Sequence, residues 1–178
     1  PKLGGWDYRG IKLNAPTKVI VSEEYILPLC GAWTFSKKFL NKLLDDFKII
    51  DSGFVIVVTD MKTFKSYSRS LLRPGMQYPE ARKAVGTEEE LETNTTTSWF
   101  NKDLYILIPN LPQQPGKFQI YALVGEVKSN VVEVEIEVAA SGERAAAAIA
   151  RDFVIESIRS IGGTSVGLFV FPEAATNH

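Results

Sequence analysis

The sequence predicts a mainly β domain of the α+β class, an antiparallel β-sandwich with one helix near residues 37–48 and a C-terminal helix and strand. In the run from Lys117 to Val138, four aliphatic residues alternate with three glutamates after Asn130. Such a period of two indicates a strand with one face on a core and the other in water. The preceding strand alternates in the same way, and Gly125-Glu126 can form the tight turn between them. Parallel strands covered on both faces seldom carry three glutamates, so the pattern favours an antiparallel sheet.

Length and composition predict one domain, or one domain with an extension. The chain has 178 residues, of which 45% are hydrophobic and 23% are charged, and these values are typical of globular proteins. A net charge of −1 provides no field that would concentrate phosphate polymers, so we expect no nucleic-acid partner. No stretch of about 18 apolar residues occurs, so we expect no membrane span. No signal peptide is recognisable, but one could have been cleaved before Pro1, so the compartment stays unknown.

The amino-terminal part is predicted to hold an arm and two strands. Residues 1–16 are rich in glycine and carry two aromatic residues, which indicates an irregular arm packed on the body. The apolar runs Lys18–Ser22 and Tyr25–Phe35 are predicted strands. Pro28 interrupts the second run, and proline in a sheet indicates an edge strand or a bulge.

A helix and a buried strand come next. Ser36 is a suitable N-cap for a helix over Lys37–Lys48, because its apolar residues fall on one stripe. The turn Asp51-Ser52-Gly53 ends this segment. Phe54–Thr59 (FVIVVT) is then a continuous apolar run, which predicts a strand buried on both faces.

The middle of the chain contains less regular patterns. Met61–Leu72 is polar but keeps two aromatic residues, which suggests another strand. Gln77–Ser98 contains proline, glycine and an acidic run, so we expect a long loop there. Leu104–Ile108 (LYILI) is predicted to resume the sheet, and the Pro-rich turn Pro109–Gly116 leads into the hairpin.

The pattern changes after Val138, and this change defines two predicted domains. Residues 1–138 would form the sandwich and residues 139–178 an extension that packs on it. In the extension, Glu143–Ile161 is a predicted helix with an apolar face. Ser165–Phe171 (SVGLFVF) is a predicted apolar strand.

Two arrangements of these elements fit the pattern. In the first, the strands form the antiparallel sandwich, with a helix in one connection. In the second, strand–helix–strand units at 26–59 and 131–171 form parallel crossovers in a mixed α/β sheet. The alternation after Asn130 favours the sandwich for the middle of the chain.

The hairpin also resembles the end of an immunoglobulin-like domain. The matching pieces are Pro115-Gly116-Lys117-Phe118, then Tyr121-Ala122, and then Ser129-Asn130 before the alternating valines. The resemblance covers residues 115–138. It implies an Ig-like β-sandwich with a binding or spacer role and no residue-level site. The chain departs from the family in having no Cys–Trp–Cys framework and in its helix after residue 36.

Histidine and cysteine are too scarce for most catalytic or metal centres. His178 and Cys30 are each the only residue of their kind, which argues against His-based triads and against His or Cys metal sites. We therefore expect no metal and no cofactor. Cys30 lies in an apolar run, where a small buried side chain is typical. Carboxylates at Asp45-Asp46, Asp51 and Asp60 remain as the basis for an enzymatic alternative.

Aromatic residues and the last strand are the predicted binding elements. Trp99 and Phe100 lie between a polar loop and a strand, so exposure would make them interaction hot spots, and burial would make them anchors. Leu168, Phe169 and Phe171 belong to the C-terminal strand, which either folds back onto the sheet or crosses to another subunit. The expected partner is a protein, including a second copy of the chain.

These features favour a non-catalytic module for protein binding or assembly. One alternative is a structural subunit that oligomerises through its C-terminal strand. Another is an enzyme that uses carboxylates or a bound cofactor, with no catalytic residue indicated. The sequon Asn94-Thr95-Thr96 would bear a glycan only in a secreted eukaryotic protein.

Overall fold

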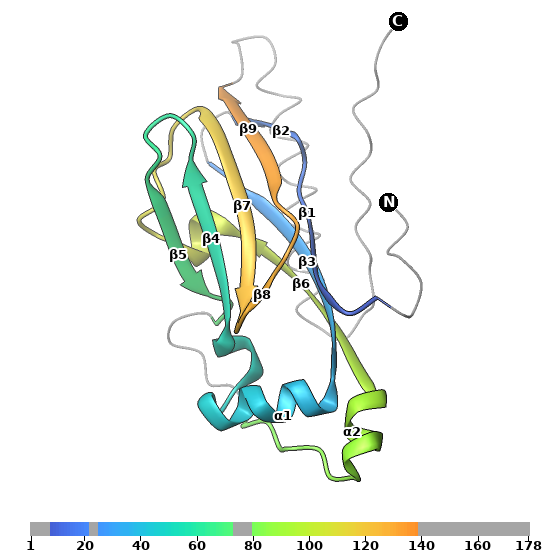
Figure 1. Cartoon of the computed structure of the whole chain (residues 1–178). Coiled ribbons are helices and arrows are strands. Elements are labelled where there is room, and N and C mark those ends of the chain that lie inside the picture. Colours follow the sequence, from blue (N-terminus) through green and yellow to red (C-terminus); the bar gives the residue numbers. More distant parts are fainter. Residues whose placement is uncertain (1–7, 22–24, 73–79, 139–178) are drawn as a thin grey trace, which may run out of the picture.

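The first sheet is antiparallel and has the strand order β1-β3-β6 (Figure 1). The computed structural model describes residues 8–21, 25–72 and 80–138. The strands of this sheet are β1 (Gly10–Asn14), β3 (Pro28–Ser36) and β6 (Thr95–Asp103). β3 is therefore the central strand, with β1 and β6 on either side of it.

The second sheet has the strand order β2-β9-β7-β4-β5. Its pairs are antiparallel except for β2 with β9, which is parallel. A two-residue strand, β8, pairs with the end of β7 through the predicted turn at Gly125-Glu126, where Gly125 has φ 54°. The strands of this sheet are β2 (Lys18–Val21), β4 (Phe54–Asp60), β5 (Ser66–Ser70), β7 (Gly116–Val124), β8 (Val127–Lys128) and β9 (Val132–Val138).

Both sheets contribute to one hydrophobic core, so the mainly β, α+β prediction is confirmed. Trp33 from the first sheet lies 5.4 Å from Phe54 of the second, measured between ring centroids. In β9, Val134 and Ile136 are buried, as the alternation predicted. The intervening Glu135 is partly exposed and pairs with Lys117 of β7 at 3.6 Å.

The predicted helix is present as α1 (Lys37–Asp46), which ends two residues earlier than expected. The Ser36 side chain accepts a hydrogen bond from the Phe39 N–H at 3.2 Å, so Ser36 is the N-cap. A 3₁₀ turn, η1 (Ile50–Gly53), then leads into β4.

Because β3 and β4 lie in different sheets, α1 does not connect two parallel strands of one sheet. The crossover expected at 26–59 in the mixed α/β alternative is therefore wrong. Pro28 is also not on an edge strand or at a bulge. It is the first residue of β3, where its missing N–H costs no interior ladder bond, and the register with β6 is continuous beyond it.

Two expectations for the middle of the chain are wrong. Residues 77–98 do not form one long loop, because they contain the helix α2 (Glu88–Thr93) and the start of β6. Residues 104–108 do not resume the sheet, because they hold the one-turn helix α3 (Leu104–Leu107). In each case a cap decides the outcome: Thr87 forms a capping box with Glu90, and Asp103 accepts a hydrogen bond from the Tyr105 N–H at 3.0 Å.

The amino-terminal expectation also needs correction, since β1 occupies residues 10–14 of the predicted irregular arm. The predicted helix at 143–161, the predicted strand at 165–171 and the proposed extension 139–178 lie outside the described residues. Within the described parts of the chain, no helix is both long enough and apolar enough to span a membrane.

Candidate functional site

β6 has one edge that no described strand covers. Its other edge pairs with β3 along the whole strand, from Thr95 opposite Ser36 to Asp103 opposite Pro28. Beyond this ladder, no backbone hydrogen bond joins residues 95–101 to another described segment. The nine residues, TTTSWFNKD, are rich in β-branched and aromatic types and contain no proline. Between Thr95 and Asn101, the β6 edge therefore offers backbone N–H and C=O groups that no described strand takes up.

Trp99 stands on the outer face of this sheet. It is directly opposite Ala32 of β3, which in turn is opposite Lys12 of β1. Opposed residues share a face of a sheet, so the large indole lies beside the small alanine side chain. Trp99 is 46% exposed. Next to it, the Thr97 and Thr34 hydroxyls form a hydrogen bond of 2.9 Å across the same face.

Phe100 points the opposite way and packs against the core. It lies opposite Gly31 of β3, and its ring covers the glycine backbone. A Cβ atom added at Gly31 would lie only 2.2 Å from the Phe100 Cζ atom. The pair predicted from the sequence is thus divided: Phe100 anchors β6 from the inside, and Trp99 is exposed on the outside.

The other strand edges are better protected than the β6 edge. At β1, the Asn130 side chain accepts a hydrogen bond from the Leu13 N–H at 2.8 Å and donates one to the Leu13 carbonyl at 3.0 Å. The amide group of Asn130 therefore satisfies both backbone groups of Leu13 on this edge. β2 has four residues and β5 has five, and the β5 sequence SYSRS is polar. Short or polar edge strands resist pairing with other chains.

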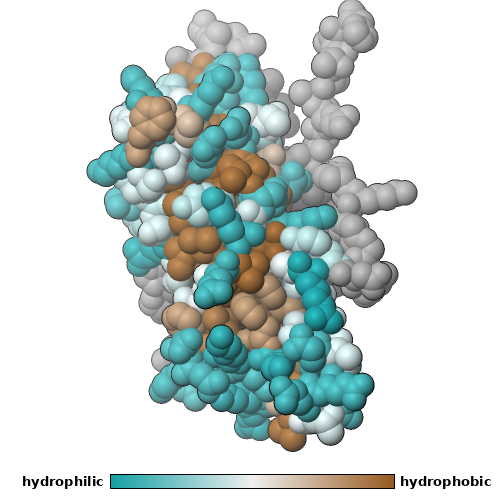
Figure 2. Space-filling model, viewed as in Figure 1, coloured by the Kyte–Doolittle hydropathy of each residue, from teal (hydrophilic) through white to brown (hydrophobic). Residues whose placement is uncertain are grey.

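A shallow hollow of about 430 Å³ lies elsewhere, above α1. Figure 2 shows apolar side chains gathered in the middle of the face viewed in Figure 1, with hydrophilic ones around them. The Arg9 guanidinium and the Lys38 ammonium both approach the Glu92 carboxylate, at 3.5 and 3.7 Å. These contacts pair the Arg9 and Lys38 cations with the Glu92 carboxylate at the rim of the hollow. The side chains at its wall are Arg9, Phe35, Lys38, Phe39, Lys42, Glu92 and Val127.

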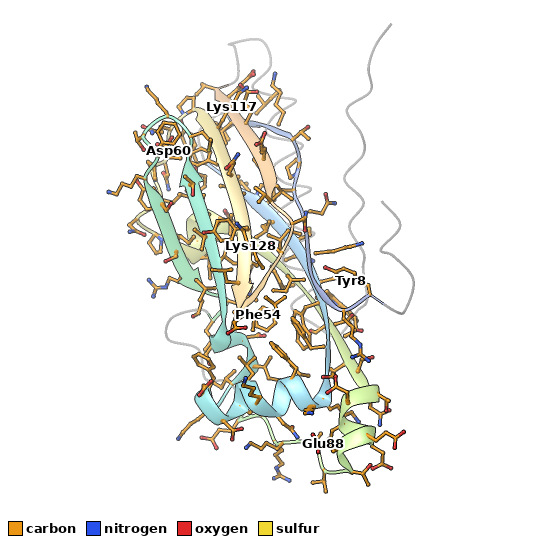
Figure 3. All side chains as sticks on the ribbon, in the orientation of Figure 1. Tyr8, Phe54, Asp60, Glu88, Lys117 and Lys128 are labelled. Atoms are coloured by element: carbon orange, nitrogen blue, oxygen red, sulfur yellow. The ribbon has the colours of Figure 1, made fainter. Side chains whose placement is uncertain are left out.

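Asp60 is a buried carboxylate whose contacts are local. It accepts hydrogen bonds from the Lys62 N–H at 2.8 Å, from the Thr63 hydroxyl at 2.9 Å and from the Gln114 amide at 3.3 Å. Burial alone would raise its pKa, but the hydrogen bonds outweigh this effect and hold the pKa below its usual range. Asp60 lies at the end of the molecule away from Glu88 (Figure 3), and it closes the β4–β5 turn.

The remaining titratable groups do not come together in the hollow. Burial raises the pKa of Asp51, against an opposing effect of Lys102. Burial also raises the pKa of the Cys30 thiol to about 11, so Cys30 is a protonated, weakly reactive thiol at neutral pH. The Tyr105 hydroxyl is buried without a hydrogen-bond partner among the described residues, and this burial raises its pKa. Asp45 pairs with Lys83 on the surface.

No family model matches the sequence, and no curated protein matches it. Within residues 8–21, 25–72 and 80–138, no group of three or more His, Cys, Asp or Glu side chains is arranged to hold a metal ion.

The structure brings together only part of the predicted binding set. Trp99 and Phe100 lie on opposite faces of β6, and Leu168, Phe169 and Phe171 lie outside the described residues. Sequence reasoning missed the edge itself, although the β-branched run Thr95-Thr96-Thr97 indicated a strand. It also missed Phe64, which is 75% exposed at the β4–β5 turn with φ 57°.

Proposed function

We propose that this protein is a non-catalytic protein-binding module that pairs an extended segment of a partner with the β6 edge. The observation that carries the proposal is the β6 edge from Thr95 to Asn101, which pairs with no described strand and lies next to an exposed tryptophan. Strand addition of this kind derives affinity from backbone hydrogen bonds, and side chains beside the edge supply selectivity. Trp99 is the side chain best placed to do so, because tryptophan is enriched among residues that dominate binding energy.

The proposed scaffold is an Ig-like β-sandwich. In immunoglobulin domains, strands A, B, E and D form one sheet, and strands C, F and G, with C′ in variable types, form the other. The orders β1-β3-β6 and β9-β7-β4-β5 support this assignment, with β6 in the place of strand E. Strand D would lie next to β6, and it has no counterpart among the described residues. The helix α1 between β3 and β4 is a departure from the family pattern.

Assembly through the C-terminal strand is a second form of the same proposal. It would use Leu168, Phe169 and Phe171, which are apolar and close together in the sequence. The enzymatic alternative has less support, since Asp51 and Asp60 do not line the hollow and hydrogen bonds within the β4–β5 turn account for Asp60.

Selection from a displayed library of random nonapeptides tests the proposal on the full chain. We expect enriched peptides with β-branched or aromatic residues at alternate positions. Trp99→Thr keeps a good strand former but removes the apolar surface, and it should weaken binding at least about tenfold. The matched control is Phe64→Ala, which removes another exposed aromatic side chain at a different place and should leave binding unchanged.

The backbone contribution can be tested separately. A selected peptide that is N-methylated at alternate residues loses the N–H donors of one of its edges only. One of the two methylation patterns should abolish binding and the other should preserve it, because a strand pairs with β6 through one edge. Equal binding of both N-methylated peptides, or enrichment unaffected by Trp99→Thr, would refute strand pairing at β6.

A further inference from the structure

The β4–β5 turn (residues 61–65) presents a large aromatic side chain to solvent. The Phe64 side chain is 75% exposed, and it is not among the described residues that form or contact the hydrophobic core. Its φ of 57° lies in the left-handed region, which is uncommon for a bulky residue and which glycine or asparagine occupies more readily. Strained positions of this kind are concentrated at binding and catalytic sites. The core and the shape of the turn therefore do not account for an aromatic ring at this position.

Hydrogen bonds within the turn hold Phe64 in this conformation. The Phe64 N–H donates to the Asp60 carbonyl at 2.8 Å, and the Asp60 N–H donates to the Lys65 carbonyl at 3.0 Å. The buried Asp60 carboxylate accepts hydrogen bonds from the Lys62 N–H and the Thr63 hydroxyl, at 2.8 and 2.9 Å. A turn that is ordered before it binds loses little conformational entropy on binding. The ring is thus displayed on a pre-organised support.

The surface beside Phe64 is basic. Lys62 and Lys65 are exposed on either side of it in the sequence, and residues 61–70 contain no acidic residue. The Lys65 ammonium lies 5.2 Å from the centre of the Tyr67 ring, and this contact keeps the cation beside the turn. The exposed end of the hairpin therefore combines one aromatic ring with two cations.

The arrangement of acidic residues leaves the turn positively charged. Two of the three glutamates of β9 pair with lysines, Glu135 with Lys117 at 3.6 Å and Glu137 with Lys18 at 2.8 Å. The helix α2 contains four glutamates and no basic residue, and it lies at the end of the molecule opposite the β4–β5 turn (Figure 1). Although the net charge of the chain is −1, this separation of charge directs the turn towards an anionic surface.

We infer that the β4–β5 turn docks the protein reversibly on an anionic lipid bilayer. The Phe64 ring enters the boundary between headgroups and acyl chains, and Lys62 and Lys65 contact the lipid phosphates. A single-stranded nucleic acid fits this surface less well, because it stacks on successive aromatic rings and Tyr67 packs against the core. The turn belongs to the sheet that does not contain β6, so the inference does not depend on the proposed function.

The expected binding is weak and reversible, as for other single membrane anchors. A lysine near an anionic bilayer strengthens binding about fivefold, and burial of most of a phenylalanine ring strengthens it about tenfold or more. The electrostatic part should fall at high salt, because the screening length shortens to about 3 Å at 1 M.

Co-sedimentation of the full chain with vesicles tests the role of charge. We expect binding to vesicles of equal parts phosphatidylcholine and phosphatidylserine, and at least about tenfold weaker binding to phosphatidylcholine alone. Lys62→Gln/Lys65→Gln should weaken binding to the anionic vesicles at least about tenfold. The matched control, Lys42→Gln/Lys128→Gln, removes the same charge from exposed sites on α1 and β8 and should change binding less than about twofold. Equal binding to both vesicles, or equal losses in the two variants, would overturn the inference.

Replacing Phe64 separates a role in binding from a role in the fold. Phe64→Asn removes the ring and suits the left-handed conformation, so vesicle binding should fall about tenfold or more while the urea midpoint stays the same or rises. Phe64→Trp should keep binding and shift its tryptophan emission to shorter wavelength on anionic vesicles. A lower urea midpoint for Phe64→Asn with unchanged vesicle binding would assign the ring to the fold and contradict docking.

Two further measurements identify the surface and its partner. Trp99→Thr should leave vesicle binding unchanged, just as Phe64→Ala should leave nonapeptide binding unchanged, so each of the two proposals can fail while the other stands. A fluorescent single-stranded oligonucleotide should bind no more tightly to the wild type than to Phe64→Asn. Oligonucleotide binding that requires Phe64, without binding to anionic vesicles, would identify nucleic acid as the partner and overturn the inference.

Discussion

Replacing Gly31 by alanine tests whether the Phe100 ring holds β6 in place. The new Cβ atom would lie 2.2, 2.6 and 2.7 Å from three ring carbons of Phe100, whereas carbon atoms prefer to be about 3.5–4.0 Å apart. The ring must therefore move by more than about 1 Å, and overpacking of this kind costs about 1–3 kcal/mol. With a slope of about 2 kcal/mol/M, a loss of 2 kcal/mol lowers the urea midpoint by about 1 M.

Urea unfolding followed by tryptophan fluorescence measures this loss, and a second variant shows its cause. Phe100→Leu removes the ring, so alanine at Gly31 should cost at least about 1 kcal/mol less in the double variant than alone. Gly86→Ala is the control, because its Cβ would meet the end of the Glu90 side chain at 3.0 Å and otherwise only Glu90 Cβ and Leu91 Cδ2, at 3.5 and 3.8 Å. A cost below about 0.3 kcal/mol for Gly31→Ala, or strict additivity with Phe100→Leu, would refute the anchoring role of Phe100.

Four other predictions concern stability and reactivity. Asn130→Ala should cost about 1–3 kcal/mol in urea unfolding, and Asn130→Asp should not restore the loss, because a carboxylate repels the Leu13 carbonyl. Asp60→Asn should lower the free energy of unfolding by about 1–3 kcal/mol at pH 7. Because the pKa of Asp60 is lowered in the folded protein, this difference is complete above the unfolded pKa of about 3.9 and should shrink as the pH falls below that value. The Cys30 thiol should react with a disulfide reagent about tenfold more slowly in the folded than in the unfolded protein, because burial raises its pKa to about 11 and lowers its thiolate fraction; equal rates would contradict its burial. Tyr105→Phe should leave the thermal midpoint unchanged or raise it, since the hydroxyl has no hydrogen-bond partner in residues 8–21, 25–72 and 80–138, and a clear drop would reveal a partner for that hydroxyl.

The sequence predicts those elements whose signals are local. Ser36 and the apolar stripe after it identify α1 because a cap and a helical face lie within one short segment. The alternation in β9 identifies its buried face in the same way, since Val134 and Ile136 face the core and Glu135 pairs across the strand surface with Lys117.

β6 was missed because its signal depends on a distant partner. Thr95, Thr96 and Thr97 are all exposed, so the first half of the strand shows no alternation between buried and exposed residues. Its strand conformation comes from pairing with β3, which lies far away in the sequence. The prediction of a strand after Asp103 is wrong for a different reason. Short apolar runs suit a strand or a helix equally, and here the Asp103 cap decides for the helix.

The two aromatic residues predicted as binding elements, Trp99 and Phe100, also depend on information from a distant strand. Once β6 is known to be a strand, Trp99 and Phe100 must point to opposite faces. Which of them faces inward depends on the space that Gly31 leaves on β3. No spacing within the sequence contains that information, because it is a property of the register between β3 and β6.

The route of the chain before β6 explains why its edge stays uncovered by the described strands. Residues 80–94 could have run beside β6, but they bond to α1, to the turn after it and to Arg9. The Ala81 N–H donates to the Lys48 carbonyl, and Asn41 of α1 pairs with both backbone groups of Ala84 at 2.8 Å. These bonds direct the connection along the end of the molecule rather than along the sheet. Replacing Asn41 by alanine should therefore loosen residues 80–94 without protecting β6, so the accessibility of the edge and the anchoring of this connection are separable properties.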